Sequence, residues 1–388
     1  MNKKLGYYIV DGMEFSSKIQ ACIYGTRHNK SVKWVFNDDV FTSFDWTTEP
    51  EETMDQLYDK RARDLREMYD YIIISYSAGA DSHNVLSAFL RQNLHVDELI
   101  INTMSKGNEK FATISPNEFS AKNSPASEHV LQAMPRLKEI SDKHPNIKIT
   151  IMDLTDYLFD SFNKVDNASW VLQKRESLDP INATRYNYLH VNEVQRRFDK
   201  DKKIAVIMGV EKPRVYISKD NNVFIMFNDR STNITAVDDH ITEYNNATVE
   251  YFYWHPSCAK MICKQAHVIK KWLEAFPKNQ ERWMDSQPQL GRCYRLLHER
   301  VYRTLIYTTW DNAWYQADKS MGDWYNEFDS WFIEGHKDTN AYRVWQEGLG
   351  YVRDNASAYL AIKDGFAMGL TNFCKYYVIG PLKHGIIR

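Results

Sequence analysis

The sequence has few of the features that mark secreted, membrane or nucleic-acid-coating proteins. Its 388 residues include only five cysteines, an odd number at wide spacing, which argues against a disulfide framework. The formal net charge is −2, so the chain is not coated with basic residues. No stretch approaches the roughly 18 apolar residues of a membrane span, and the first residues have no signal-peptide core. We therefore expect a cytoplasmic protein with no membrane association.

The centre of the chain alternates short apolar runs with helical patterns. The runs lie at 71–76, 98–103, 147–154 and 204–209. They are continuously apolar, which is typical of strands that are covered on both faces in a parallel sheet. The sequence therefore predicts an α/β fold with a doubly wound, mostly parallel sheet. Ligands of such folds bind beyond the carboxyl ends of the strands.

The flanking regions differ from this centre. Strand-like pieces at 6–10, 18–25 and 31–36 predict a small β-rich leader, and apolar residues at helical spacing predict a helix over 50–69. Two apolar runs around a polar turn at 219–222 predict a β-hairpin. From about 257 the pattern is mostly helical and rich in tryptophan. We expect three domains: a leader at 1–48, an α/β domain at 49–256 and a helical C-terminal domain at 257–388.

The stretch "IIISYSAGADSHNV", residues 72–85, places a turn of small residues between a predicted strand and a predicted helix. Such a turn directs the free N–H groups of the helix N-terminus, and the positive end of its dipole, toward an anion. Ser77 and Ser82 add hydroxyl groups, and small residues between them allow a phosphate to approach the backbone. Asp81 would repel a bare phosphate unless Mg²⁺ bridges the two. The plainer alternative is a connection in which Asp81 and Ser82 only cap the helix.

This turn resembles the PP-loop, S-G-G-x-D-[ST], of the N-type ATP pyrophosphatases, an adenine nucleotide alpha-hydrolase-like superfamily with the HUP fold that includes asparagine synthetase. Here the loop runs through Ser77, Ala78, Gly79, Ala80, Asp81 and Ser82. It follows the first predicted parallel strand, as it does in that superfamily. Ala78 replaces the first glycine of the motif, and a left-handed conformation there would cost roughly 1 kcal/mol.

Two later segments extend the resemblance, which covers about residues 70–215 and is closest in layout to the synthetase domain of asparagine synthetase. The end of the second strand, which contacts adenine in that superfamily, carries Thr103 and Met104 here; a plain β–α loop is the alternative. After the fourth strand, Gly209 and Glu211 stand where the family has a glycine and a metal-binding carboxylate. Lys212 and Arg214 follow in the same loop, where they would stabilise the charge that develops on a leaving pyrophosphate. The alternative is an ordinary solvated basic pair.

The resemblance implies an ATP-dependent ligase. Loop 77–82, Thr103, Met104 and Gly209 would bind ATP and pyrophosphate, Asp81 and Glu211 would bind Mg²⁺, and Lys212 and Arg214 would be catalytic. An acceptor oxygen would be adenylated with release of pyrophosphate, and a nitrogen nucleophile would then displace AMP to form a C–N bond. The acceptor, a small molecule or a nucleobase, stays open. A non-catalytic ATP- or AMP-binding or scaffold protein is the alternative, because Ala78 departs from the motif and the family's acidic string is missing.

Three other patterns carry weaker hypotheses. His255, Cys258, Cys263 and His267 offer zinc ligands, although their segment looks like one amphipathic helix. Residues 260–303 hold ten basic against four acidic side chains with interleaved aromatics, which would suit tRNA or DNA, or simply solvated helices. The tryptophan-rich segment after it would line a pocket or pack a helical core. His83, just after the loop, is expected to be an exposed helix-start residue and not a catalytic one.

Overall fold

The computed structural model describes residues 3–103, 106, 128–156, 187–229, 246–286, 294–315, 335–354, 362–363, 366–367 and 373–383. Its centre is a five-stranded sheet in which every pairing is parallel. The strands are β4 (Tyr71–Ser75), β5 (Glu98–Thr103), β6 (Lys148–Asp153), β7 (Ile204–Met208) and β10 (Ala247–Tyr251). The predicted α/β fold is confirmed, and β10 is an edge strand that the sequence did not indicate.

The strand order β10-β7-β4-β5-β6 fixes where a ligand can bind. From β4 the chain moves to β5 and β6 on one side, and it then returns to β7 on the other side of β4. The connections that leave β4 and β7 therefore diverge at the carboxyl edge of the sheet. This divergence is the topological switch point at which open α/β sheets bind their ligands.

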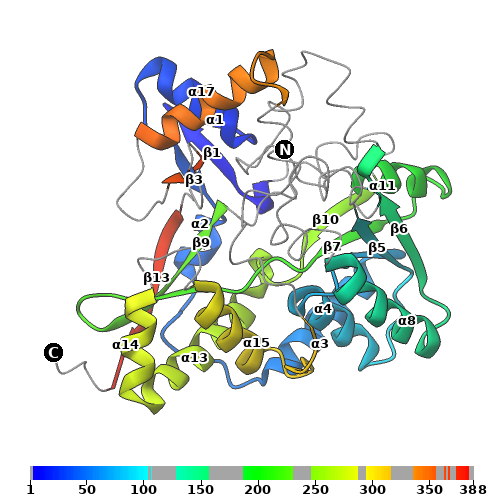
Figure 1. Ribbon diagram of the computed structural model, residues 1–388. Helices are drawn as coiled ribbons and strands as arrows, with labels where there is room; N and C mark the ends of the chain where they lie inside the picture. The colour runs from blue at the N-terminus through cyan, green and yellow to red at the C-terminus, as the bar shows by residue number, and fades with distance from the viewer. Residues whose placement is uncertain are drawn as a thin grey trace.

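Helices from the central region cover the sheet, as Figure 1 shows. They are α3 (Met54–Met68), α4 (Ala80–Leu90), α8 (Met134–Lys143), which follows a π-helical turn at Glu128–Ala133, and α11 (Asn187–Arg196). The predicted helix over 50–69 is confirmed but begins later, because Thr53 and Gln56 form a capping box. The predicted helical stretch before 187 lies outside the described residues.

The leader forms a three-stranded antiparallel sheet with order β2-β1-β3. Its elements are a 3₁₀ turn (Lys3–Leu5), β1 (Tyr7–Val10), β2 (Met13–Phe15), α1 (Lys18–His28), β3 (Lys33–Val35) and α2 (Asp38–Ser43). The strand predicted at 18–25 is wrong, since that segment is helix α1. The side chain of Ser17 caps α1, and Ile19, Cys22 and Ile23 recur at helical spacing on its buried face.

A third sheet joins the middle of the chain to its C-terminal part, with order β13-β9-β8. The predicted hairpin is confirmed as β8 (Arg214–Ile217) and β9 (Asn222–Asn228). Strand β13 (Phe373–Pro381) lies antiparallel to β9, in a region predicted to be helical. Two further strands, β11 (Ile362–Lys363) and β12 (Phe366–Ala367), are two residues long and pair antiparallel with each other.

Helices dominate the rest of the C-terminal part. They are a 3₁₀ turn (Pro256–Cys258), α13 (Ala259–Ala275), α14 (Pro277–Ser286), a π-helical turn (Tyr294–Glu299), α15 (Arg300–Ile306) and α17 (Asn340–Asp354). Helix α17 lies along α1 (Figure 1), where Arg27 forms an ion pair with Glu347. Within the residues described, no helix has the length and apolar character needed to cross a membrane.

A buried ion pair connects α3 to the edge strand β10. Arg61 Nη2 lies 2.8 Å from Glu250 Oε2, and both side chains are almost fully buried. Tyr69 donates a second hydrogen bond to Glu250, at 2.6 Å. Burial alone would raise the pKa of Glu250, but Arg61 and Tyr69 hold the pKa below its ordinary value. The carboxylate is therefore charged and depends on Arg61.

We predict that Arg61→Met lowers the free energy of unfolding by about 3–5 kcal/mol, because it leaves Glu250 charged and buried. The matched control is Lys60→Met, which breaks the exposed Lys60–Asp64 pair on the same helix. That change should cost less than about 1 kcal/mol. Urea denaturation of both variants measures the difference, and equal costs would contradict the prediction.

Candidate functional site

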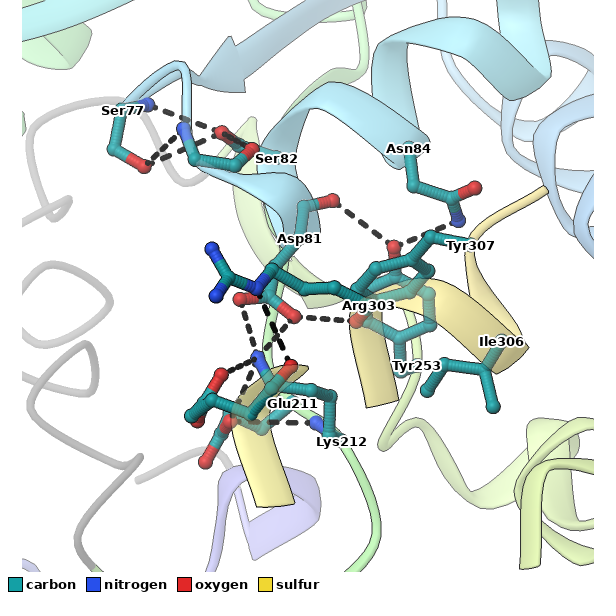
Figure 2. Close-up of polar contacts among 12 residues, drawn as sticks. Ser77, Asp81, Ser82, Asn84, Glu211, Lys212, Tyr253, Arg303, Ile306 and Tyr307 are labelled. Carbon is teal, nitrogen blue, oxygen red and sulfur yellow. Dashed lines mark hydrogen bonds and ion pairs between the residues drawn. The ribbon is translucent and has the colours of Figure 1, made fainter. Parts of the chain in front are cut away.

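Loop 77–82 connects β4 to α4 at the switch point of the sheet. Gly79 is the N-cap residue of α4 and has extended φ and ψ angles of −76° and 169°. The first N–H groups of a helix have no intrahelical acceptor, so those of Ala80, Asp81 and Ser82 are available to an anion. The Ser82 hydroxyl holds the loop together, since it accepts from Ser77 N at 3.2 Å and contacts Ser77 Oγ at 3.3 Å (Figure 2).

Ala78 adopts the left-handed conformation, with φ at +58°. Glycine occupies such positions without steric cost, whereas an alanine Cβ costs about 1–2 kcal/mol. Arg136 of α8 donates a hydrogen bond to the Ala78 carbonyl, and Gln132 Nε2 donates to the Ser77 carbonyl at 3.0 Å. The departure from the PP-loop motif thus falls at a position of positive φ, and neighbouring side chains hold the loop in that shape.

Asp81 and Lys212 form the central contact of the site. Lys212 Nζ lies 2.6 Å from both carboxylate oxygens of Asp81 and 3.2 Å from Glu299 Oε2. The Lys212 side chain is only 3% exposed. Burial alone would lower the pKa of Lys212, but the carboxylates of Asp81, Glu299 and Glu211 raise it above its ordinary value. The ammonium group is therefore charged and fully engaged.

The connection after β7 brings the predicted residues 209–214 against the loop. A Cβ on Gly209 would lie 3.1 Å from Ser82 N, so this glycine permits a close approach of the two backbones. Arg214 Nη2 lies 2.5 Å from Glu211 Oε2, and Lys212 Nζ lies 3.5 Å from Glu211 Oε1. Lys212 and Arg214 are both buried, so the alternative of a solvated basic pair is wrong.

The fold also brings to the site three residues that sequence reasoning missed. Glu299 contacts Lys212, and the Tyr307 hydroxyl donates to Asp81 Oδ1. Tyr253, which follows β10, donates to the Asp81 carbonyl at 2.9 Å and accepts from Asn84 at the same distance (Figure 2). Residues 299, 303 and 307 are spaced four apart in the sequence, although Tyr307 lies just beyond the end of α15 and has extended backbone angles. That spacing was the available signal, but nothing in it identified the loop as the target.

Aromatic side chains surround the other side of the loop. The guanidinium of Arg136 lies 4.7 Å from the ring centre of Trp310 and 4.9 Å from that of Trp314. His83 packs edge-on against Trp314 and contacts the Tyr76 hydroxyl at 3.0 Å. Burial and the charge of Arg136 lower the pKa of His83 to about 4, so its ring is neutral at neutral pH. The prediction of an exposed His83 is wrong.

Thr103, at the end of β5, is buried, and Met104 lies outside the described residues. The predicted contact of the end of β5 with adenine therefore stays a prediction.

The tryptophan-rich segment is described only as far as Tyr315, and its remainder lies outside the described residues.

The four proposed zinc ligands do not converge. Cys258 Sγ points to the Phe252 carbonyl, and Cys263 Sγ and His267 Nε2 both lie against the Trp46 carbonyl. Across the described ranges, no group of three or more His, Cys, Asp or Glu side chains could hold a metal ion. The segment is helix α13, with its cysteines in the core, as the amphipathic alternative predicted.

The lysines of the basic stretch 260–303 are largely neutralised by acidic side chains. Lys260 pairs with Glu52 at 2.8 Å, and Lys264 and Lys271 both pair with Glu49. Lys270 pairs with Glu274 one turn along the same helix. A surface whose lysines already have carboxylate partners releases few counterions from a nucleic acid. This arrangement favours the alternative of solvated amphipathic helices.

The expected magnesium ligands, Asp81 and Glu211, do not fit a resident Mg²⁺ ion. Magnesium needs near-octahedral oxygen ligands, and here Lys212 holds both oxygens of Asp81 while Arg214 holds Glu211. The Asp81 carboxylate nevertheless has a neighbouring cation. The side chain of Lys212 supplies it.

No protein-family model matches this chain, and no curated protein matches it either. The site consists of a helix N-terminus at the switch point, with two buried cations, Lys212 and Arg214, in the segment that follows β7.

Both Ala78→Gly and Ala88→Gly change the free energy of unfolding. We predict that the Ala78→Gly variant is the more stable of the two by about 1–2 kcal/mol. Both alanines are fully buried and belong to the same strand-loop-helix unit. Glycine relieves the left-handed strain at position 78, whereas at 88 it only weakens the helix. Thermal and urea denaturation measure both costs, and an Ala78→Gly variant that is the less stable of the two would refute the strain at Ala78.

Proposed function

We propose that the chain is a cytoplasmic, PP-loop-type ATP-binding ligase with a HUP-like α/β core. It would adenylate an acceptor oxygen, release pyrophosphate and form a C–N bond. The observation that carries this proposal is the position of loop 77–82. The loop places free helix N–H groups at the switch point of a parallel sheet, directly beside the buried cations of the connection after β7. The match to the PP-loop motif supports a nucleotide phosphate as the anion.

The proposed reaction has two balanced steps. In the first step the acceptor oxygen attacks the α-phosphorus of ATP, the new O–P bond forms, and the bond to the β-phosphate oxygen breaks, so that pyrophosphate leaves. In the second step a nitrogen nucleophile attacks the activated carbon, a C–N bond forms, AMP leaves with the acceptor oxygen, and the nitrogen loses a proton. The acceptor would be a small molecule or a nucleobase.

The residues of the site would act mainly through electrostatics. The N–H groups of Ala80, Asp81 and Ser82 would hold the leaving pyrophosphate at the positive end of α4. Lys212 and Arg214 would offset the charge that develops on it. Mg²⁺ would arrive with the nucleotide as Mg·ATP, because Asp81 and Glu211 are already paired with cations.

A non-catalytic nucleotide-binding protein is the second candidate. The strained Ala78 and the engagement of Lys212 by carboxylates favour it, because both oppose tight closure on a reacting phosphate. The two candidates differ in turnover and not in binding. A protein that binds ATP and releases no pyrophosphate with any acceptor would be of the second kind. Among the described residues of 260–303, four lysines already pair with carboxylates, which favours a small acceptor over a polynucleotide.

Pyrophosphate release from Mg·ATP can be measured over pools of amino acids, nucleobases and tRNA. We predict that the rate of release falls at least about tenfold in Ser82→Ala. This variant loses the hydroxyl that organises the loop around Ser77. The matched control is Ser87→Ala on the same helix, whose hydroxyl donates to the His83 carbonyl one turn earlier. The control should keep the wild-type rate. Absence of release with every pool, or equal rates in the two variants, would count against a catalytic loop.

A further inference from the structure

The pyrophosphate loop contains a carboxylate that an anion would have to tolerate. Asp81 is the second residue of α4, among the N–H groups proposed to hold phosphate. In the sequence, a bridging Mg²⁺ ion was the expected solution to this repulsion. The structure has another solution, because a side-chain ammonium lies against the same carboxylate.

Lys212 has the position and contacts that a bridging cation would have. Its Nζ atom contacts Asp81 through both oxygens at 2.6 Å, Glu299 at 3.2 Å and Glu211 at 3.5 Å. Oxygen atoms of three acidic residues from three separate segments therefore surround one nitrogen. The ammonium also lies 5.9 Å from the ring centre of Tyr307, whose hydroxyl donates to Asp81. The donors are oxygens of the kind that Mg²⁺ prefers, but an amine occupies their centre.

The burial of Lys212 makes this cation a fixed part of the site. The side chain is 3% exposed, so its charge is not free to move into solvent. Lys212 follows Glu211 directly and precedes Arg214 by two residues, so this short segment carries one acidic and two basic side chains. Glu211 is in turn held by Arg214, which keeps that carboxylate from attracting a second cation.

We propose that the Lys212 ammonium is an internal substitute for a resident divalent metal, so that pyrophosphate binds to loop 77–82 without a metal ion. This inference rests on the proposed function, since it assumes that the loop binds pyrophosphate. It adds that Asp81 is neutralised by the chain itself and is not a metal ligand. It also implies that removal of the lysine exposes a carboxylate cluster that a metal can enter.

The experiment measures binding of inorganic pyrophosphate by isothermal titration calorimetry, in EDTA and in MgCl₂, for the wild type and for Lys212→Met. Wild-type affinity in EDTA should stay within about threefold of that in magnesium. The affinity of Lys212→Met in EDTA should fall at least about tenfold, and magnesium should restore it, because Asp81 and Glu299, which lose their ammonium partner, can then hold the ion together with oxygens of pyrophosphate. A second readout is the binding of Mn²⁺ in the absence of pyrophosphate, measured by electron paramagnetic resonance. We expect Mn²⁺ to bind to Lys212→Met and not to the wild type.

Asp81→Asn keeps the proposal testable if Lys212→Met does not fold, because it removes one charge and preserves the side-chain shape. If Asp81 is neutralised by Lys212, this variant should bind pyrophosphate in EDTA as tightly as the wild type or more tightly. If Asp81 holds a metal, the variant should lose the magnesium-dependent part of its affinity. Ser87→Ala on the same helix is the neutral control for both measurements.

The outcomes separate this inference from the proposed function. Wild-type binding that disappears in EDTA, or Mn²⁺ bound by the wild type, would overturn the internal cation and leave the pyrophosphate loop standing. Unchanged binding and no Mn²⁺ uptake in Lys212→Met would also overturn it. If the wild type binds pyrophosphate neither in EDTA nor in magnesium, then the loop itself is not a pyrophosphate site, and both proposals fail.

Discussion

The contact between Asp81 and Lys212 is the interaction on which the site depends. It joins the start of α4 to the connection after β7, the two segments that diverge at the switch point. Glu299 and Tyr307 add the C-terminal part to the same contact. Lys212 is buried while the Asp81 side chain is 31% exposed, and the desolvation of the ammonium group offsets much of the attraction in the pair. Its effect is to fix one arrangement of three distant segments around the loop.

The shape of the loop has a separate physical cause. Ala78 lies at positive φ, where its Cβ is a cost, and the chain offsets this cost with the buried Arg136. The Arg136 guanidinium donates to this carbonyl and also lies against the indole rings of Trp310 and Trp314, which contact each other edge to face. The loop thus has positive charge on both sides: Arg136 supports its backbone and Lys212 neutralises its acidic side chain. Both arrangements suit an anion above the helix N-terminus.

Sequence patterns predicted four strands of the sheet, and the continuous apolar runs of β4, β5 and β7 are largely buried as expected, whereas β6 at the edge is partly exposed. They failed where local pattern and tertiary context disagree. Residues 18–25 have the apolar content of a strand, but Ser17 caps them as a helix. Strands β10 and β13 owe their pairing to partners far away in the chain, which no local window contains. The loop was predictable from its small residues and its place after β4, whereas Glu299, Tyr307 and Tyr253 reach it only through the fold.

The same reasoning explains why the sequence suggested a metal at Asp81. In the sequence a carboxylate within a phosphate loop has no visible counter-charge, and Mg²⁺ is the simplest one to assume. Lys212 is 131 residues away and becomes its neighbour only because β7 lies beside β4. Strand order therefore determines the chemistry of the loop, since a different order would place another connection, with other charges, against α4. The counter-charge of Asp81 thus follows from the topology of the sheet and not from the motif.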